Sequence, residues 1–274
     1  MLIRLKHMAA KLIVLGLMLL TLMAINRPAV ANAQSAEDSV TVPSSDPATP
    51  LPAFTGTSDP LIQQRELAAY IQANGLSARV AQVDLEQFPK ISQYADIDTS
   101  ASGYGFNACG LVAAAAALGG PDWTPLVGSI ADAAGADYSA ASGIQPSRYV
   151  AALPAVFGAD TVAAMNAATL GDLYRELSAG RIVIVDIQVN ANTEWPSADA
   201  PNYAHFARVL GIDVDKGEVY IENTLSGGPY WTLSLSEFVQ VWDHPETAVS
   251  LIPDPQNAEP VTRWMVILDD VPTL

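Results

Sequence analysis

The first regular alternation of apolar and polar positions along the chain lies in residues 61–75. Its apolar residues recur at the three- and four-residue steps of an amphipathic helix, and they are Leu61, Ile62, Leu67, Tyr70 and Ile71. Gly75 follows the last turn, where a helix commonly ends in a glycine. We therefore expect one amphipathic helix in this segment.

Two further segments are predicted to be helices. Residues 109–118 form an alanine-rich run without a charged side chain, and the glycines at 119 and 120 stop it, which predicts a buried helix. Residues 169–178 begin with Thr169 and Asp172 at the spacing of a capping box, and Gly180 ends the pattern.

Strand patterns dominate the second half of the chain. β-branched and alternating apolar residues predict strands in segments 181–189, 205–213, 218–224, 229–235 and 262–268. A short helix is expected to begin at Ser234, because Glu237 stands at its N3 position. Helices come first and strands cluster later, so the pattern predicts an α+β domain with an antiparallel sheet.

Strands 205–213 and 218–224 are expected to pair as a hairpin centred on Val214. Alternation places His205 and Val209 on one face of the first strand, and Val219 and Asn223 on one face of the second. A turn centred on Val214 sets Val209 opposite Val219 and His205 opposite Asn223. A register shifted by one residue would move the apolar side chains of the second strand to the other face, which the pattern disfavours.

The N-terminus has the three-part layout of a secretory signal. A short basic stretch precedes an apolar run at residues 12–25, and the small residues Ala31 and Ala33 suit cleavage before Gln34. The apolar run is shorter than the roughly 20 residues that cross a bilayer, which favours a cleaved signal over an uncleaved signal anchor. We expect a secreted protein, extracellular or periplasmic, without stable membrane association after cleavage.

The remaining chain is divided by composition into three parts. Residues 34–60 are rich in Pro, Ser, Thr and acidic residues without periodicity, so we expect a disordered linker. Residues 61–87, which hold the first helix, are either a pro-segment or a brace on the domain that follows, and the pattern is compatible with both. Residues 88–274 form the main domain.

Charge excludes two classes of partner. Residues 1–33 hold four of the 13 basic residues and none of the 29 acidic ones, so the remaining chain has nine basic and 29 acidic residues, a net charge of −20. Nucleic acids and anionic membrane surfaces are bound through basic patches, so neither is an expected partner. The sequence says nothing about the oligomeric state.

Cysteine is used once in 274 residues, at Cys109, where the alanine-rich helix begins. A lone cysteine among alanines can be a small buried apolar residue. It becomes a nucleophile as the thiolate, which a helix N-terminus and a neighbouring imidazolium both favour. After the signal, the histidines are His205 and His244, and His244 beside a proline is expected to be a surface residue. One cysteine and two histidines without metal-type spacing predict no metal site, and no cofactor is implied.

In the order Cys109, His205 and Asn223, the chain resembles the papain-like cysteine peptidases, and within them the bacteriocin-processing branch, family thirty-nine of the cysteine peptidases. The resemblance rests on ISQYADIDTSASGYGFNACGLVAAAAALGG, LYRELSAGRIVIVDI, HFARVLGIDVDKGEVYIENT and WTLSLSEFVQVW. It implies a bacterial papain-like fold in which a helix with the cysteine packs against an antiparallel sheet with the histidine and the asparagine.

The resemblance also implies roles for four residues. Cys109 would be the nucleophile, His205 its base, Asn223 the residue that orients the imidazole, and Gln93 a donor to the oxyanion, together with the backbone N–H of Cys109. The sequence departs from the branch at Ala108, which stands where an acidic or amide residue is common.

The implied function is a secreted cysteine peptidase that cleaves peptide bonds in a peptide or protein substrate through an acyl-enzyme on Cys109. Two alternatives stay open. The same groups could serve an amidase that acts on cell-wall peptides or a transglutaminase-like acyl transferase. The fold could also be a catalytically inactive binding domain.

Overall fold

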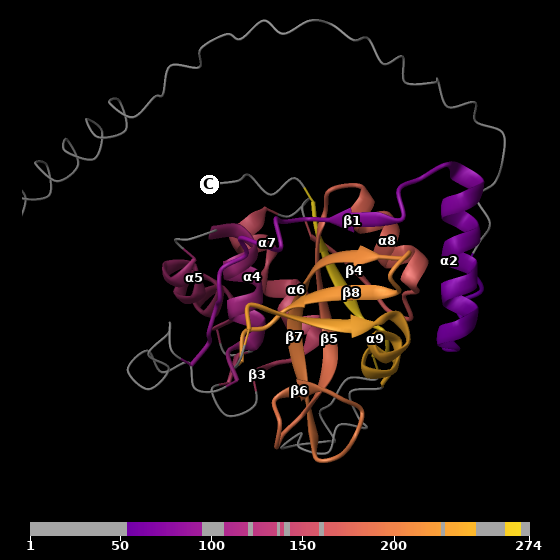
Figure 1. The fold of residues 1–274 in the computed structure, drawn as a ribbon. Helices are drawn as coiled ribbons and strands as arrows, with labels where there is room; N and C mark the ends of the chain where they lie inside the picture. The colour runs from indigo at the N-terminus through magenta and orange to yellow at the C-terminus, as the bar shows by residue number, and fades with distance from the viewer. Residues whose placement is uncertain are drawn as a thin grey trace, which may run out of the picture. The chain divides into compact units, whose positions relative to one another are not determined.

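A mixed α/β fold with a central antiparallel sheet is seen in the computed structural model (Figure 1). The structure describes residues 54–94, 107–119, 123–135, 138–139, 143–158, 162–225, 228–244 and 261–269, all within one compact unit, Pro50–Leu274. The predicted signal and the linker up to residue 53 lie outside the described residues. In the described part, no helix is both long enough and apolar enough to cross a bilayer.

The central sheet has the strand order β4-β10-β5-β7-β8-β9, with β1 paired to β7 and β6 paired to β5. Its strands are β1 (Arg79–Ala81), β4 (Val162–Met165), β5 (Ile182–Asn190), β6 (Trp195–Pro196), β7 (Asn202–Asp213), β8 (Glu218–Glu222), β9 (Tyr230–Ser234) and β10 (Met265–Leu268). Each of these pairings is antiparallel, which confirms the predicted α+β class. A separate two-stranded ladder joins β2 (Tyr138–Ser139) to β3 (Gly143–Ile144).

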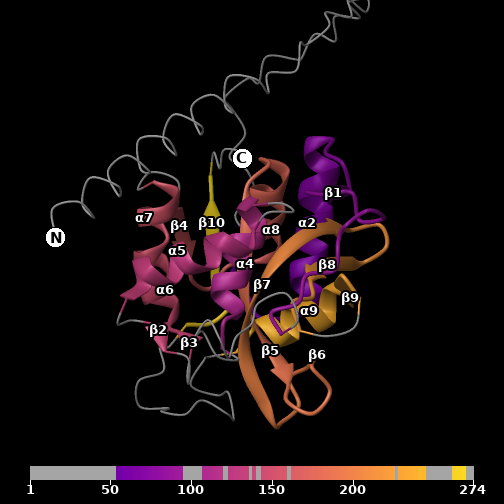
Figure 2. The same ribbon diagram turned by 90° about the vertical axis from the view of Figure 1, so that its left-hand side faces the viewer.

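Helices cover both faces of the sheet (Figures 1 and 2). One face holds α4 (Cys109–Gly119), α5 (Thr124–Ala134), α6 (Pro146–Ala152) and α7 (Pro154–Phe157), and the other holds α2 (Pro60–Asn74), α8 (Leu170–Ser178) and α9 (Leu235–Trp242). Each layer has its own apolar core, because alternate residues of β5 and β7 point to opposite sides. Ile184 and Phe206 belong to the α4 side, and Val185 and Ala207 to the α8 side.

The predicted helix starts are confirmed at atomic detail. At α8, the hydroxyl of Thr169 accepts from the backbone N–H of Asp172 at 3.1 Å, and the Asp172 carboxylate accepts from the N–H of Thr169 at 2.9 Å. Ser234 and Glu237 form the same reciprocal pair at α9. Each capping box satisfies backbone donors that the first turn of a helix leaves unpaired, which is why the sequence signal locates the helix start.

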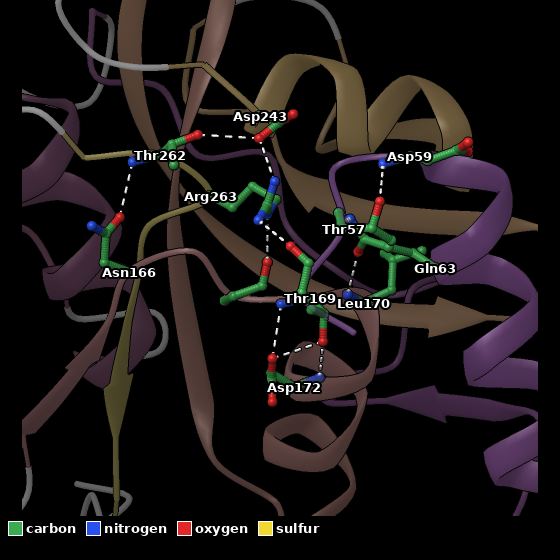
Figure 3. Close-up of polar contacts among 12 residues, drawn as sticks. Thr57, Asp59, Gln63, Asn166, Thr169, Leu170, Asp172, Asp243, Thr262 and Arg263 are labelled. Carbon is green, nitrogen blue, oxygen red and sulfur yellow. Dashed lines mark hydrogen bonds and ion pairs between the residues drawn. The ribbon is translucent and has the colours of Figure 1, made fainter. Parts of the chain in front are cut away.

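Helix α2 packs into the core of the domain through Leu67, Tyr70 and Ile71. Its buried Gln63 donates to the carbonyl of Thr57 at 2.7 Å and accepts from the backbone N–H of Leu170 at 2.8 Å, so that it ties α2 to the start of α8 (Figure 3).

Arg263, which lies shortly before β10, also connects the segments near the starts of α2 and α8. Its guanidinium donates to the carbonyls of Ala168 and Gly56 and pairs with Asp243 at the end of α9 (Figure 3). Four segments far apart in sequence therefore converge on one buried cation.

The predicted register between β7 and β8 is wrong. Val209 lies opposite Ile221 rather than Val219, and a β-bulge follows, so that Asp213 pairs with Glu218. Four residues form the turn instead of one, because Gly217 adopts a left-handed φ of 70° and its N–H donates to the carbonyl of Val214. At Val209 the shift equals two residues, so Val209 and Ile221 keep their predicted faces, but Asn223 is no longer opposite His205. On the turn side of the bulge the shift equals three residues, so Ile212 pairs with Val219 and joins the core that holds Val209.

Candidate active site

One pocket brings together three of the four predicted site residues. It encloses about 330 Å³ and is lined by Gln93, Cys109 and His205, together with Tyr94, Tyr203 and Glu194 among others. Gln93 lies in the segment between β1 and α4, Cys109 begins α4, and His205 lies in β7. Asn223, directly after β8, is buried but does not line the pocket.

Gly110 allows the N-terminus of α4 to approach β7 closely. A Cβ atom at Gly110 would lie 3.1 Å from the ring of Phe206 and 3.5 Å from that of Tyr149. The hydroxyl of Tyr149 donates to the carbonyl of Gly110 at 2.7 Å and holds the helix start in place. Because Phe206 is the neighbour of His205 in β7, this close packing positions Cys109 beside the strand that carries the histidine.

Burial keeps both candidate catalytic groups uncharged. It raises the pKa of the Cys109 thiol to about 11, against the opposing effect of hydrogen bonding to the backbone of Phe206. Burial also lowers the pKa of the His205 imidazole to about 3. At neutral pH the thiol is therefore protonated and the imidazole neutral, whereas the helix N-terminus alone favours a thiolate.

The hydrogen bonds around His205 define its tautomer. Its Nε2 lies 3.4 Å from the hydroxyl of Thr224, and that hydroxyl donates to Oε1 of Gln93 at 3.2 Å. A threonine hydroxyl has a single proton, so toward His205 it can only accept, and Nε2 then bears the hydrogen. The lone pair lies on Nδ1, which is buried and has no hydrogen-bond partner among the described residues.

Thr224 also holds Gln93. The backbone N–H of Gln93 donates to the carbonyl of Thr224 at 2.8 Å, in addition to the side-chain bond between the two residues. Because Oε1 of Gln93 accepts from Thr224, the NH₂ end of the amide is the donor group of this side chain. The hydroxyl of Tyr94 is hydrogen bonded to Gln93 and to Tyr203, which extends the network across the pocket.

Asn223 does not have the predicted neighbour. Its Oδ1 accepts from the backbone N–H of Leu225 at 3.1 Å, in the turn after β8. The four-residue turn and the bulge displace it along β8, and Thr224 takes the position next to the imidazole. The predicted role of Asn223 as an orienting residue stays a prediction, while the observed hydrogen-bond partner of His205 is Thr224.

Several residues of the pocket escaped the sequence analysis. Thr224 follows Asn223 directly, but its proximity to His205 depends on the register. Tyr94 follows Gln93, and Tyr203 precedes His205 by two residues on the same strand face, which is a usable signal. Glu194 lies in the loop before β6, where no periodic pattern exists.

The second histidine is not a surface residue as predicted. His244 is only 5% exposed and follows the end of α9. In the described part of the chain, no group of three His, Cys, Asp or Glu residues is arranged to hold a metal ion.

A larger pocket of about 720 Å³ lies between α4, α5 and the segment after β1, where Ala116, Trp123 and Arg208 line it. Cysteine and histidine are absent from its described lining, so volume alone does not mark the site of chemistry.

Comparisons with known proteins find similarity in structure. No protein-family model matches the chain, and no curated protein matches it. A crystal structure described as a "putative C39-like peptidase" from Bacillus anthracis aligns with 69% of this chain and 96% of that chain, at 13% sequence identity and a TM-score of 0.45.

Proposed function

We propose that the protein is a cysteine peptidase that cleaves peptide bonds through an acyl-enzyme on Cys109. The main support is the placement of the chain's single cysteine, which keeps intermediate exposure, in one pocket with His205 and Gln93. Nδ1 of His205 has no hydrogen-bond partner among the described residues. A structural cysteine needs neither an imidazole nor an amide beside it.

The proposed reaction begins with a neutral pair. As the sulfur of Cys109 attacks the carbonyl carbon of the scissile bond, Nδ1 of His205 takes the thiol proton. The C–N bond then breaks, the same proton passes to the leaving amine, and a thioester remains. In the second half, a water molecule attacks the thioester with His205 again as the base, which releases the carboxylate and restores the thiol.

Charge develops on the carbonyl oxygen during both halves of the reaction. The backbone N–H of Cys109 lies at the first position of α4, where N–H groups lack helical partners, and Gln93 lines the same pocket. Two such donors form an oxyanion hole of the usual composition, and each is expected to contribute on the order of 10²-fold in rate.

Thr224 is a positioning residue in this scheme. Because its hydroxyl accepts from Nε2 of His205 and donates to Gln93, it sets the tautomer of the base and the orientation of the amide with one side chain. This connection lets the base and the oxyanion donor move together when substrate binds.

The test is peptide cleavage by the signal-free chain, residues 34–274, with new termini identified by mass spectrometry in a peptide library. We expect cleavage by the unaltered protein, loss of about 10³-fold or more in Cys109→Ala, and a loss of about 10²-fold or more in His205→Gln. Glu86→Gln, an exposed change outside the pocket, should leave the rate unchanged.

Folding of each variant is verified by its circular dichroism and thermal midpoint. Cleavage by Cys109→Ala at the unaltered rate would refute the proposal. So would the absence of new termini in the presence of a folded protein with an intact thiol, and the binding-domain alternative would then be favoured.

A further inference from the structure

The pocket around Cys109 has an acidic wall. Glu194 lines it, and the lining residues among those the structure describes include neither lysine nor arginine. Among the described residues, Glu194 forms no ion pair. Its carboxylate therefore has no cationic partner in the described part of the chain and lines the pocket as a negative group.

The backbone holds Glu194 in place. Its φ of 52° lies in the left-handed region, which is uncommon for residues other than glycine. The N–H of Glu194 donates to the carbonyl of Asn190 at 2.9 Å, and Oδ1 of Asn190 accepts from the N–H groups of Asn192 and Thr193. The backbone of the loop, including Glu194, is therefore tied back to the end of β5.

Two aromatic rings complete the surroundings of this carboxylate. Tyr94 and Tyr203 line the same pocket, and their hydroxyls are hydrogen bonded to each other. After the main effect of burial, the negative charge of Glu194 raises the pKa of Tyr94, which reports that the carboxylate and the phenol are close. Aromatic faces together with one carboxylate are the combination that binds ammonium and guanidinium groups.

We propose that Glu194, with Tyr94 and Tyr203, forms a subsite for a cationic group next to Cys109, so that the preferred substrates are peptides with a lysine or arginine side chain near the scissile bond. The choice of a peptide as the ligand depends on the proposed peptidase function, whereas the cationic subsite does not.

The electrostatics of the remaining molecule act in the same direction. The whole chain has a net charge of −16, so cationic peptides are attracted and acidic ones repelled at a distance. Asp186 is also negative and influences Cys109, but it is buried and does not line the pocket. Contact with the ligand is therefore assigned to Glu194 and not to Asp186.

Because Cys109 is the only cysteine, the rates at which charged thiol-specific reagents modify the protein depend on the electrostatic potential around this one side chain. The experiment compares the rates at which three methanethiosulfonates modify the signal-free protein: the cationic 2-aminoethyl, the neutral methyl and the anionic 2-sulfonatoethyl reagent. Each rate is divided by that of a small cysteine peptide at the same pH and ionic strength. The variants are Glu194→Gln, Glu194→Lys and, as a matched control that removes one acidic charge elsewhere, Glu86→Gln.

We expect the unaltered protein to favour the cationic over the anionic reagent. This ratio should fall by about five- to tenfold in Glu194→Gln, reverse in Glu194→Lys, and stay unchanged in Glu86→Gln, as a local charge in a partly desolvated pocket requires. An equal ratio in Glu194→Gln and the unaltered protein would overturn the subsite.

A second arm uses paired peptides that differ only by lysine or glutamate at each position around a cleaved bond. The preference for lysine in kcat/KM should fall with Glu194→Gln at one position while neutral peptides keep their rate. Cleavage of both peptides with an unchanged preference would refute the inference and leave the peptidase proposal standing. A Glu194-dependent reagent ratio without any cleavage would refute the peptidase proposal and retain the cationic subsite.

Discussion

His205 is almost completely buried, although the proposed reaction requires its imidazole to accept a proton. It is 1% exposed, lies against the rings of Tyr203 and Trp231, and forms one side-chain hydrogen bond, to Thr224. Such surroundings disfavour the imidazolium, which is why burial lowers the pKa of His205 to about 3. The imidazole is therefore neutral over the whole neutral and mildly acidic range, and the same burial makes it a weak base toward the thiol.

The same burial predicts how stability depends on pH. In the unfolded chain His205 binds a proton near pH 6.5, whereas in the folded protein it does so only near pH 3. The unfolded state therefore binds more protons between these values, so the contribution of neutral His205 to stability is complete above about pH 6.5 and is lost as the pH falls toward 3.

The measurement is the free energy of unfolding by denaturant at several pH values from 7.5 to 3.5, for the unaltered protein and His205→Gln. The decrease toward acid should be smaller in the variant, by up to on the order of 4 kcal/mol. Glu222, whose pKa burial raises to about 7, contributes the opposite slope in both proteins and cancels in the comparison. Parallel curves would show that the folded protein protonates His205 at an ordinary pH.

At the scale of elements, helix α2 is joined to the domain by an apolar face and by one buried amide. Leu67, Tyr70 and Ile71 lie in the core cluster of α8 and α9, and the ring of Tyr70 packs edge-on against Tyr174 at 6.3 Å between centroids. The N–H of Leu170 is one of the donors at the start of α8 that the helix itself cannot satisfy, and Gln63 accepts from it.

Replacement of Gln63 by alanine is expected to cost about 2 kcal/mol of unfolding free energy, because two hydrogen bonds are lost and a buried N–H stays unsatisfied. The control is Gln72→Ala, an exposed glutamine on the same helix, which should change stability by less than about 0.5 kcal/mol. Urea titrations of both variants provide the comparison. Equal costs would mean that α2 does not depend on this anchor.

At the scale of the whole molecule, the segment before β1 completes the hydrophobic core on one side of the sheet. Phe54 packs against Tyr70 and lies so close to α8 that a Cβ at Gly171 would be 2.0 Å from its ring. The two candidate roles of residues 61–87, a removable pro-segment or a brace, differ in what happens when the segment is missing.

We predict that a chain beginning at Ser77 is much less stable than one beginning at Gln34. Exposure of the apolar surface covered by Leu67, Tyr70 and Ile71 is expected to cost on the order of 5 kcal/mol, which lowers the thermal midpoint by about 10 °C or more. Differential scanning calorimetry of the two chains tests this. Equal midpoints, with higher peptidase activity in the shorter chain, would instead establish a pro-segment.

Sequence and structure agree where the determining interaction is local. Capping boxes at Thr169 and Ser234 join residues three positions apart, so both helix starts followed from the sequence. Cys109 and His205 could be identified from the sequence, because one cysteine and two histidines after the predicted signal allow only two cysteine–histidine pairs. Alternation likewise determined the shared face of Val209 and Ile221, but not that of Ile212, which the bulge moves to the side of Val209.

Tertiary structure decided what depends on distances between strands and loops. Alternation has a period of two residues, so the two-residue shift at Val209 keeps its face and cannot be excluded by the pattern. This shift is why Thr224 rather than Asn223 contacts His205. The pKa directions of Cys109 and His205 follow from burial by segments distant in sequence. Glu194 enters the pocket from a loop without periodicity, and only the folded chain places its charge beside the thiol.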